Sequence, residues 1–183
     1  YFKIIIMSYF KFLVILISFF FSNHTISSDK LSFDDLYLSK SDLELFKVSL
    51  KEGDKTKWAR SLNSGKKINN KVAKKIIKWR WLIAQDGLTD INTLKQFYLE
   101  NRNWPKQYKI KEKIESKISI KNDKVEMLWF QENPPKSGIG KIKLAEMLIK
   151  NNFKNEGFWL LNEAWKNNTF SYSEEKYILT KFK

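Results

Sequence analysis

The sequence predicts an all-α fold, an α/α superhelix of antiparallel helix pairs of the tetratricopeptide-like type, preceded by an N-terminal signal segment. From Leu31 onward, apolar residues recur at helical spacing with frequent breaks, and no segment alternates steadily between apolar and polar residues. Among 183 residues, Gly (6) and Pro (3) are scarce, which disfavours folds rich in tight turns. Short helices joined by short breaks are expected to pack as antiparallel neighbours.

The first half of the domain is expected to contain four helices, each with one apolar face. The first spans Asp42–Lys51, with Leu43, Phe46 and Leu50 inward, and is ended by Gly53-Asp54; the second carries Trp58, Ala59 and Leu62 and is stopped by Asn63-Ser64-Gly65. The third carries Val72, Ile76, Trp79 and Ile83 and ends near Asp86-Gly87. The fourth is capped by Thr89 or Asp90 and carries Ile91, Leu94 and Tyr98.

The second half is expected to continue in the same way. Its helices are one opened by Asn103-Trp104-Pro105, with Pro105 in the first turn and Ile110, Ile114 and Ile118 inward; one capped by Asn122 or Asp123, with Val125, Leu128 and Trp129, broken by Asn133-Pro134-Pro135; one from Ser137 or Gly138 with Ile142, Ala145, Leu148 and Ile149; one from about Lys154 to Asn167 with Phe158, Leu161, Ala164 and Trp165; and a short one capped by Ser173, with Tyr177 and Ile178.

Two segments resemble each other in the manner of a repeat. Leu50 to Gly53, then Trp58-Ala59 and Leu62, parallels Leu148 to Asn151, then Glu156-Gly157 and Leu160. Both indicate a helix, a short turn and a second helix. The small residues Ala59 and Gly157 are expected to let the two helix backbones approach closely.

The N-terminus indicates export. Phe12 to Phe21 is an uninterrupted apolar run that follows Lys11, and a polar stretch comes after it. We expect residues 1–28 to be a signal peptide cleaved near Ser27/Ser28, and residues 29–183 to be the helical domain, in the periplasm. Met7 is a sensible start codon. The alternative is an uncleaved membrane anchor, which would leave the protein associated with the membrane.

Composition excludes several chemistries. There is no Cys, and the single His, His24, lies in the leader, so thiol, Ser-His and His-metal sites are excluded from the domain. The formal net charge of +14 favours a polyanionic partner such as nucleic acid, anionic lipid or acidic cell-wall polymer. A codon bias toward Lys, Asn and Ile is an equal explanation of that charge, and export argues against nucleic acid.

Motifs that suggest active sites have simpler structural interpretations. Glu115-Ser116 is a candidate acid, but it lies mid-helix without supporting polar groups, so we expect an exposed residue. Gly138-Ile-Gly140-Lys141 departs from the P-loop pattern and indicates a turn and helix start. Glu174-Glu175 complements a helix N-terminus. The sequence therefore assigns no catalytic, cofactor-binding or metal-binding residue, and no cofactor.

The seven Trp residues are expected mostly to pack in the core. Trp79, Trp129 and Trp165 fall on the apolar faces of their helices. Trp81 and Trp159 fall off the main stripes and are the better candidates for surface positions that stack on sugars or bases.

Three stretches together resemble a known family. They are Ile77 to Leu82 with Leu94 to Phe97 and Asn101 to Pro105; Trp129 to Gly140, leading into Leu144-Ala145-Glu146; and Leu160 to Trp165, followed by Phe170 and Glu174 or Glu175. In this order they are similar to the N-terminal superhelical region of soluble lytic murein transglycosylases, particularly the alphaproteobacterial branch. The resemblance covers about Leu43 to Phe182.

The resemblance implies a periplasmic enzyme that cleaves the MurNAc–GlcNAc bond of peptidoglycan without water, leaving 1,6-anhydromuramoyl ends. It implies a ring of helix pairs that precedes a lysozyme-like catalytic domain, whose single glutamate belongs to a Glu-Ser motif followed by Gly-Leu-Met-Gln. Glu115-Ser116 lacks that context, so no catalytic residue is carried over. The expected partners are peptidoglycan strands and the protein's own catalytic domain, beyond Lys183.

Two rival hypotheses remain open at the level of the sequence. One is a stand-alone periplasmic tetratricopeptide-like adaptor that binds a protein partner. The other is a basic nucleic-acid binder, which requires that the leader is not an export signal.

Overall fold

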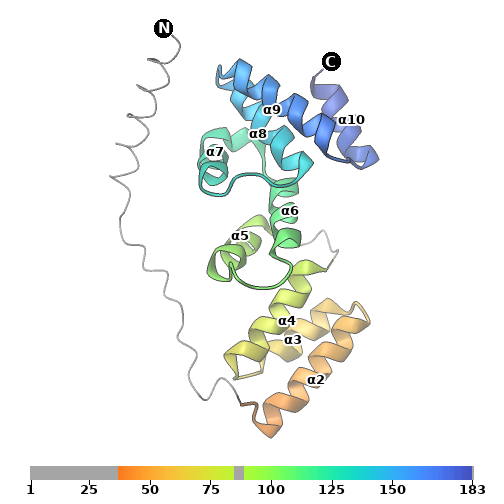
Figure 1. Ribbon diagram of the computed structural model, residues 1–183. Coiled ribbons are helices and arrows are strands. Elements are labelled where there is room, and N and C mark those ends of the chain that lie inside the picture. The colour runs from red at the N-terminus through yellow and green to blue at the C-terminus, as the bar shows by residue number, and fades with distance from the viewer. Residues whose placement is uncertain (1–36, 85–88, 183) are drawn as a thin grey trace, which may run out of the picture. The chain divides into compact units, whose positions relative to one another are not determined.

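The computed structural model describes residues 37–84 and 89–182, with the side chain of Asn122 also outside the description. Throughout these residues the regular structure is helical and no strand occurs, which confirms the all-α prediction (Figure 1). The predicted leader with His24, and the predicted helix end at Asp86-Gly87, lie outside the described residues. The elements are α2 Lys40–Asp54, α3 Trp58–Lys66, α4 Lys71–Ile83, α5 Ile91–Glu100, α6 Gln107–Lys117, the 3₁₀ turn η2 Ile120–Asn122, α7 Asp123–Glu132, α8 Gly138–Lys150, α9 Lys154–Asn167 and α10 Tyr172–Lys181.

Side-chain caps define most helix starts. Asp90 and Ser137 accept hydrogen bonds from the third backbone N–H of α5 and α8, as predicted for these two positions. Two other starts differ from the prediction. Ser39 rather than Asp42 begins α2, and a capping box of Ser171 and Glu174, rather than Ser173, begins α10.

The α5–α6 connection also differs from the prediction. Pro105 lies before the helix rather than in its first turn. The reason is Lys106, which takes a left-handed conformation (φ 57°), so α6 begins only at Gln107.

The helix pairs α2/α3 and α8/α9 share one turn geometry. Each turn has three residues, and its middle residue, Thr56 or Asn152, has a left-handed backbone with φ of 58° or 68°. The residues that precede the second helices, Lys57 and Phe153, also agree closely in φ and ψ. The predicted likeness of these two segments is therefore confirmed as a repeated helix–turn–helix.

The register of that repeat differs from the prediction by two residues. Counted from Thr56 and Asn152, Ser61 is the counterpart of Gly157, and Ser49 is the counterpart of Ala145. Ser61 is buried and donates its hydroxyl to the Ser49 carbonyl at 2.8 Å, whereas Ala59 is exposed. A Cβ on Gly157 would lie 2.9 Å from the Ala145 carbonyl oxygen. The small residue therefore meets the same carbonyl in both pairs, and Ala59 was the wrong residue.

Among residues 37–84 and 89–182, the buried apolar side chains form three core clusters. The largest joins α4 to α8 around Leu82, Phe97, Ile110, Ile114 and Met147. A second lies between α2, α3 and α4, and a third between α8, α9 and α10.

Several residues predicted to face the core are exposed. Leu43, Val125, Leu128, Phe158 and Trp165 are from 37% to 65% exposed. On α7 the inward face carries Glu126, Trp129 and Phe130 instead of Val125 and Leu128, and Glu126 forms an ion pair with Lys95 of α5 at 2.7 Å. The apolar residues of α7 are compatible with either of two buried faces, and the face that is buried is the one that carries this ion pair.

The tryptophans follow the prediction in part. Trp129 is buried, and Trp79 packs edge-on against Trp104 at 6.0 Å between ring centroids. Trp159 is 67% exposed, as expected of a surface candidate, whereas Trp81 packs against the largest core cluster. Trp165 is 45% exposed and stacks on Phe170 at 5.6 Å.

No helix within residues 37–84 and 89–182 is long and apolar enough to span a membrane.

Candidate functional site

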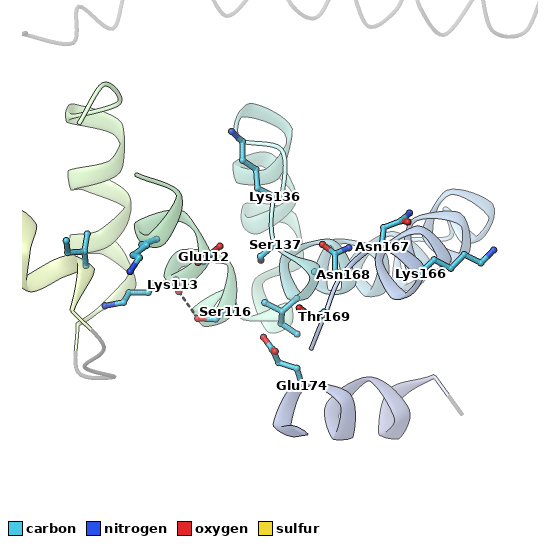
Figure 2. Close-up of a pocket in the computed structure, with 14 residues that line it drawn as sticks. Glu112, Lys113, Ser116, Lys136, Ser137, Lys166, Asn167, Asn168, Thr169 and Glu174 are labelled. Atoms are coloured by element: carbon cyan, nitrogen blue, oxygen red, sulfur yellow. Dashed lines mark hydrogen bonds between the residues drawn. The ribbon is translucent and has the colours of Figure 1, made fainter. Parts of the chain in front are cut away.

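A groove of about 840 Å³ lies where α6, the start of α8, the end of α9 and the start of α10 meet. This volume falls within the range of about 300–1,000 Å³ that is usual for small-ligand sites. Figure 2 shows Glu112, Lys113 and Ser116 on α6, with Ser137 and Asn167 to Thr169 on the opposite side and Glu174 on α10. The groove is lined by Ile83, Lys109, Glu112, Lys113, Ser116, Lys136, Ser137, Gly138, Ile139, Lys166, Asn167, Asn168, Thr169 and Glu174.

The charged lining is mainly basic. Within the described part of the chain, the ammonium groups of Lys109, Lys136 and Lys166 have no ion-pair partner. Lys113 differs, because its Nζ donates to the Leu82 carbonyl at 2.8 Å. Three lysines from α6, the α7–α8 loop and α9 are thus available to an anionic ligand.

The Lys136-Ser137 backbone is held by Glu115 of α6. The Glu115 carboxylate accepts hydrogen bonds from the backbone N–H of Lys136 at 2.9 Å and of Ser137 at 2.8 Å, and from the Ser137 hydroxyl. Its side chain is fully buried. The expectation that Glu115 is an exposed helix residue was therefore wrong, because three donors at the start of α8 satisfy its carboxylate.

Lys111 completes this buried cluster. Its Nζ lies 3.7 Å from Glu115 and donates to the Asn133 carbonyl at 2.8 Å. Burial lowers the pKa of Lys111, while the nearby Glu115 carboxylate raises it. Glu115 and Lys111 together tie α6 to the α7–α8 loop, which places Lys136 at the edge of the groove, with its side chain directed away from Ser137 in Figure 2. The Glu115 carboxylate thus accepts hydrogen bonds from groups of the protein itself, and its side chain is fully buried.

Two glycines allow close packing at the start of α8, and one of them, Gly138, lines the groove. A Cβ on Gly138 would lie 2.7 Å from Phe170 and 2.8 Å from the Cβ of Asn168. A Cβ on Gly140 would overlap the Glu115 carboxylate. The prediction of a turn and helix start for Gly138-Ile-Gly140 is confirmed, and both glycines serve close packing.

Lys143 fixes the far end of α6. Its Nζ donates to the carbonyls of Ser116 at 2.5 Å and Ile118 at 2.8 Å, which satisfies the end of the helix. Burial lowers the pKa of Lys143. On the α9 side, Asn168 donates to the Ala164 carbonyl at 2.9 Å, so both walls of the groove are held by side-chain caps.

The groove presents lysine ammonium, hydroxyl and amide groups. Within residues 37–84 and 89–182, no group of three or more His, Cys, Asp or Glu residues could hold a metal ion. The sequence did not single out Lys109, Lys136, Lys166 or Thr169, because they come from separate segments and form no local motif. These residues share a place in the lining of the groove, and that lining forms only where the four elements meet.

No protein-family description, curated protein or solved structure matches this chain.

Proposed function

We propose that this chain is the non-catalytic helical scaffold of a periplasmic lytic transglycosylase, and that it binds peptidoglycan for a lysozyme-like catalytic domain. One observation supports this most directly. Residues of the stretches that carry the family resemblance pack against one another. Trp104 packs against both Trp79 and Phe97 within the first stretch, and Gly138 of the second stretch lies against Phe170 of the third. Several large apolar residues of these stretches therefore take part in the packing of the helices.

The repeated helix pairs support the superhelical part of the proposal. Thr56 and Asn152 place α2/α3 and α8/α9 in the same turn geometry, and Ser61 and Gly157 provide the same close approach. Pairs of this kind bury their apolar faces on neighbouring pairs, as in tetratricopeptide-like solenoids.

In this proposal the chain supplies binding and positioning, and bond cleavage belongs to the separate catalytic domain. A lytic transglycosylase protonates the glycosidic oxygen and then removes a proton from the muramoyl 6-hydroxyl with one glutamate. Glu115 is committed to three hydrogen bonds and an ion pair inside the protein. The scaffold's role is to hold the long glycan strand so that the cleaved bond reaches the catalytic group.

Co-sedimentation with purified peptidoglycan sacculi tests the proposal. The purified chain should pellet with sacculi in a saturable manner, and mass spectrometry should detect no 1,6-anhydromuramoyl products. Failure to pellet would contradict the scaffold role, and release of anhydro products would contradict the non-catalytic assignment. Fusing residues 7–30 to a reporter tests export separately, since a cytoplasmic reporter would contradict the periplasmic location.

A protein-binding adaptor is the second candidate, and exposed aromatic side chains on α9 favour it. Phe158 and Trp159 are 52% and 67% exposed, and Trp159 borders an apolar pocket of about 420 Å³ together with Leu148 and Leu160. Exposed aromatic residues are enriched where proteins bind each other. If sacculi do not bind and Trp159→Ala abolishes capture of a periplasmic protein, the adaptor replaces the scaffold.

A further inference from the structure

We propose that the groove between α6, α8, α9 and α10 is the peptidoglycan-binding site, with carboxylates of the strand held by Lys109, Lys136 and Lys166. The inference rests on the proposed function and extends it, because it names the face of the domain that contacts the strand and the chemistry of the contact.

The first argument is charge. Lys109, Lys136 and Lys166 have no ion-pair partner among the described residues. With Lys113 they give the lining more lysines than acids, since only Glu112 and Glu174 contribute carboxylates. Unpaired ammonium groups around a concave surface attract an anion, because the low-dielectric protein on either side focuses their electric field.

The second argument is the polar character of the remaining lining. Ser116, Asn167 and Thr169 present hydroxyl and amide groups, and Glu112 presents a carboxylate with no ion-pair partner among the described residues. Sugar hydroxyls and N-acetyl groups can donate to and accept from such groups. A groove with both lysines and hydrogen-bonding neutral groups therefore suits a saccharide that carries carboxylates.

The same lining disfavours nucleic acid. None of the groove residues is aromatic, so unpaired bases have no ring on which to stack. Peptidoglycan combines amide-rich sugars with carboxylates on its stem peptides, and so it matches both the lysines and the neutral hydrogen-bonding groups of the groove.

Binding of soluble disaccharide-peptides tests the inference, with the full chain in calorimetry or fluorescence titration. The triple variant Lys109→Glu/Lys136→Glu/Lys166→Glu should lose about tenfold or more in affinity, since attraction at each lysine becomes repulsion. The matched control is Lys55→Glu/Lys57→Glu/Lys71→Glu, which changes the net charge equally at exposed lysines outside the groove. Its affinity should stay within about twofold of the original.

Two further ligands sharpen the result. Neutral N-acetylglucosamine oligosaccharides should bind more weakly than the disaccharide-peptides, and equally to the original chain and the groove variant. A single-stranded oligonucleotide should bind no more tightly than the disaccharide-peptides. Tighter oligonucleotide binding that the groove variant abolishes would reassign the groove to nucleic acid and overturn the inference.

The outcomes separate the inference from the proposed function. If sacculi pellet both the groove variant and the control as well as the original chain, the groove is not the binding site and the scaffold role stands. If sacculi pellet none of them, the scaffold role itself fails. Circular dichroism and thermal unfolding verify that both triple variants fold. If the triple variant does not fold, the single variants Lys136→Glu and Lys166→Glu, at exposed positions, replace it, each with an expected loss in the same direction.

Discussion

The carboxylate of Glu115 occupies the space that a side chain on Gly140 would need. A Cβ built on Gly140 would lie 2.7 Å from Cδ of Glu115 and closer still to one of its oxygens. The same carboxylate accepts the backbone N–H groups of Lys136 and Ser137, so α6 meets the first turn of α8 without an intervening layer. The lack of a side chain at Gly140 in α8 thus makes room for the buried carboxylate of Glu115 in α6, and the position of that carboxylate requires a glycine at position 140.

Gly140→Ala should destabilise the protein even though alanine is the better helix former. We expect a loss of about 1–3 kcal/mol in the free energy of unfolding, because the added methyl group displaces the Glu115 carboxylate from its donors. Urea unfolding measures the change. In the double variant Gly140→Ala/Glu115→Ala the methyl group has room. The stability losses of the two single variants, Gly140→Ala and Glu115→Ala, should therefore sum to clearly more than the stability loss of the double variant. A double-variant loss equal to that sum would contradict the proposed contact.

Glu115→Gln should also destabilise the protein, although it preserves the shape of the side chain. We expect a loss of about 2–4 kcal/mol, because the variant leaves the buried Lys111 ammonium without its counter-ion and weakens the hydrogen bonds to Lys136 and Ser137. Glu112→Gln, on an exposed face of the same helix, is the matched control and should change stability by less than about 0.5 kcal/mol. Equal effects at both positions would show that Glu115 is not specially held.

The repeat register predicts which small residue of α3 is essential. Ser61→Leu should cost about 1–3 kcal/mol or more, because Ser61 is 1% exposed and faces the Ser49 carbonyl. Ala59→Leu, two residues away and exposed, should be within about 0.5 kcal/mol of the original. Thermal unfolding of the two variants checks the prediction. The reverse order of stability would restore Ala59 as the contact residue.

Asp123→Asn should reduce the acid sensitivity of the fold. Hydrogen bonds from Lys150 and then Asn151 hold the pKa of Asp123 below its ordinary value of 3.8. As the pH falls below 3.8, the unfolded chain therefore binds more protons than the folded chain. The stabilisation that Asp123 provides is complete above that pH, and it is lost as the pH falls through the lower pKa of the folded state. The stability gap between the original and Asp123→Asn should be constant between about pH 5 and pH 7 and should narrow toward about pH 3. A gap that stays constant at every pH would rule out the coupling.

Local sequence patterns predicted the helices well because helix formation is itself a local property of the chain. The ends of α9 at Lys154 and Asn167, the cap at Asp90 and the break after Glu132 follow from residues within a few positions of each boundary. The helix pairs α2/α3 and α8/α9 were also predicted, because a short break between two apolar helices is a local signal. The boundaries that failed, at Ser39, Lys106 and Ser171, depend on a single cap or a single left-handed residue.

The buried faces were less predictable. On α7, Val125, Leu128 and Trp129 fit one stripe and Glu126, Trp129 and Phe130 fit another. Lys95 of α5 pairs with Glu126 at the second stripe, which is the buried one. On α9, Phe158 and Trp165 lie beside the buried stripe of Gly157 and Ala164, which packs on α8. The apolar pattern of a helix limits which of its faces can be buried, and packing against the neighbouring helix decides which one is buried.

By itself, the amino-acid sequence determined that the chain is helical, where most of its helices lie, and that it carries no Cys and no His after His24. Only the tertiary structure decided that Glu115 is buried and that lysines from three separate segments line one groove. The reason is physical: helix formation depends on residues within a turn or two, whereas burial and charge clustering depend on which distant helices come into contact.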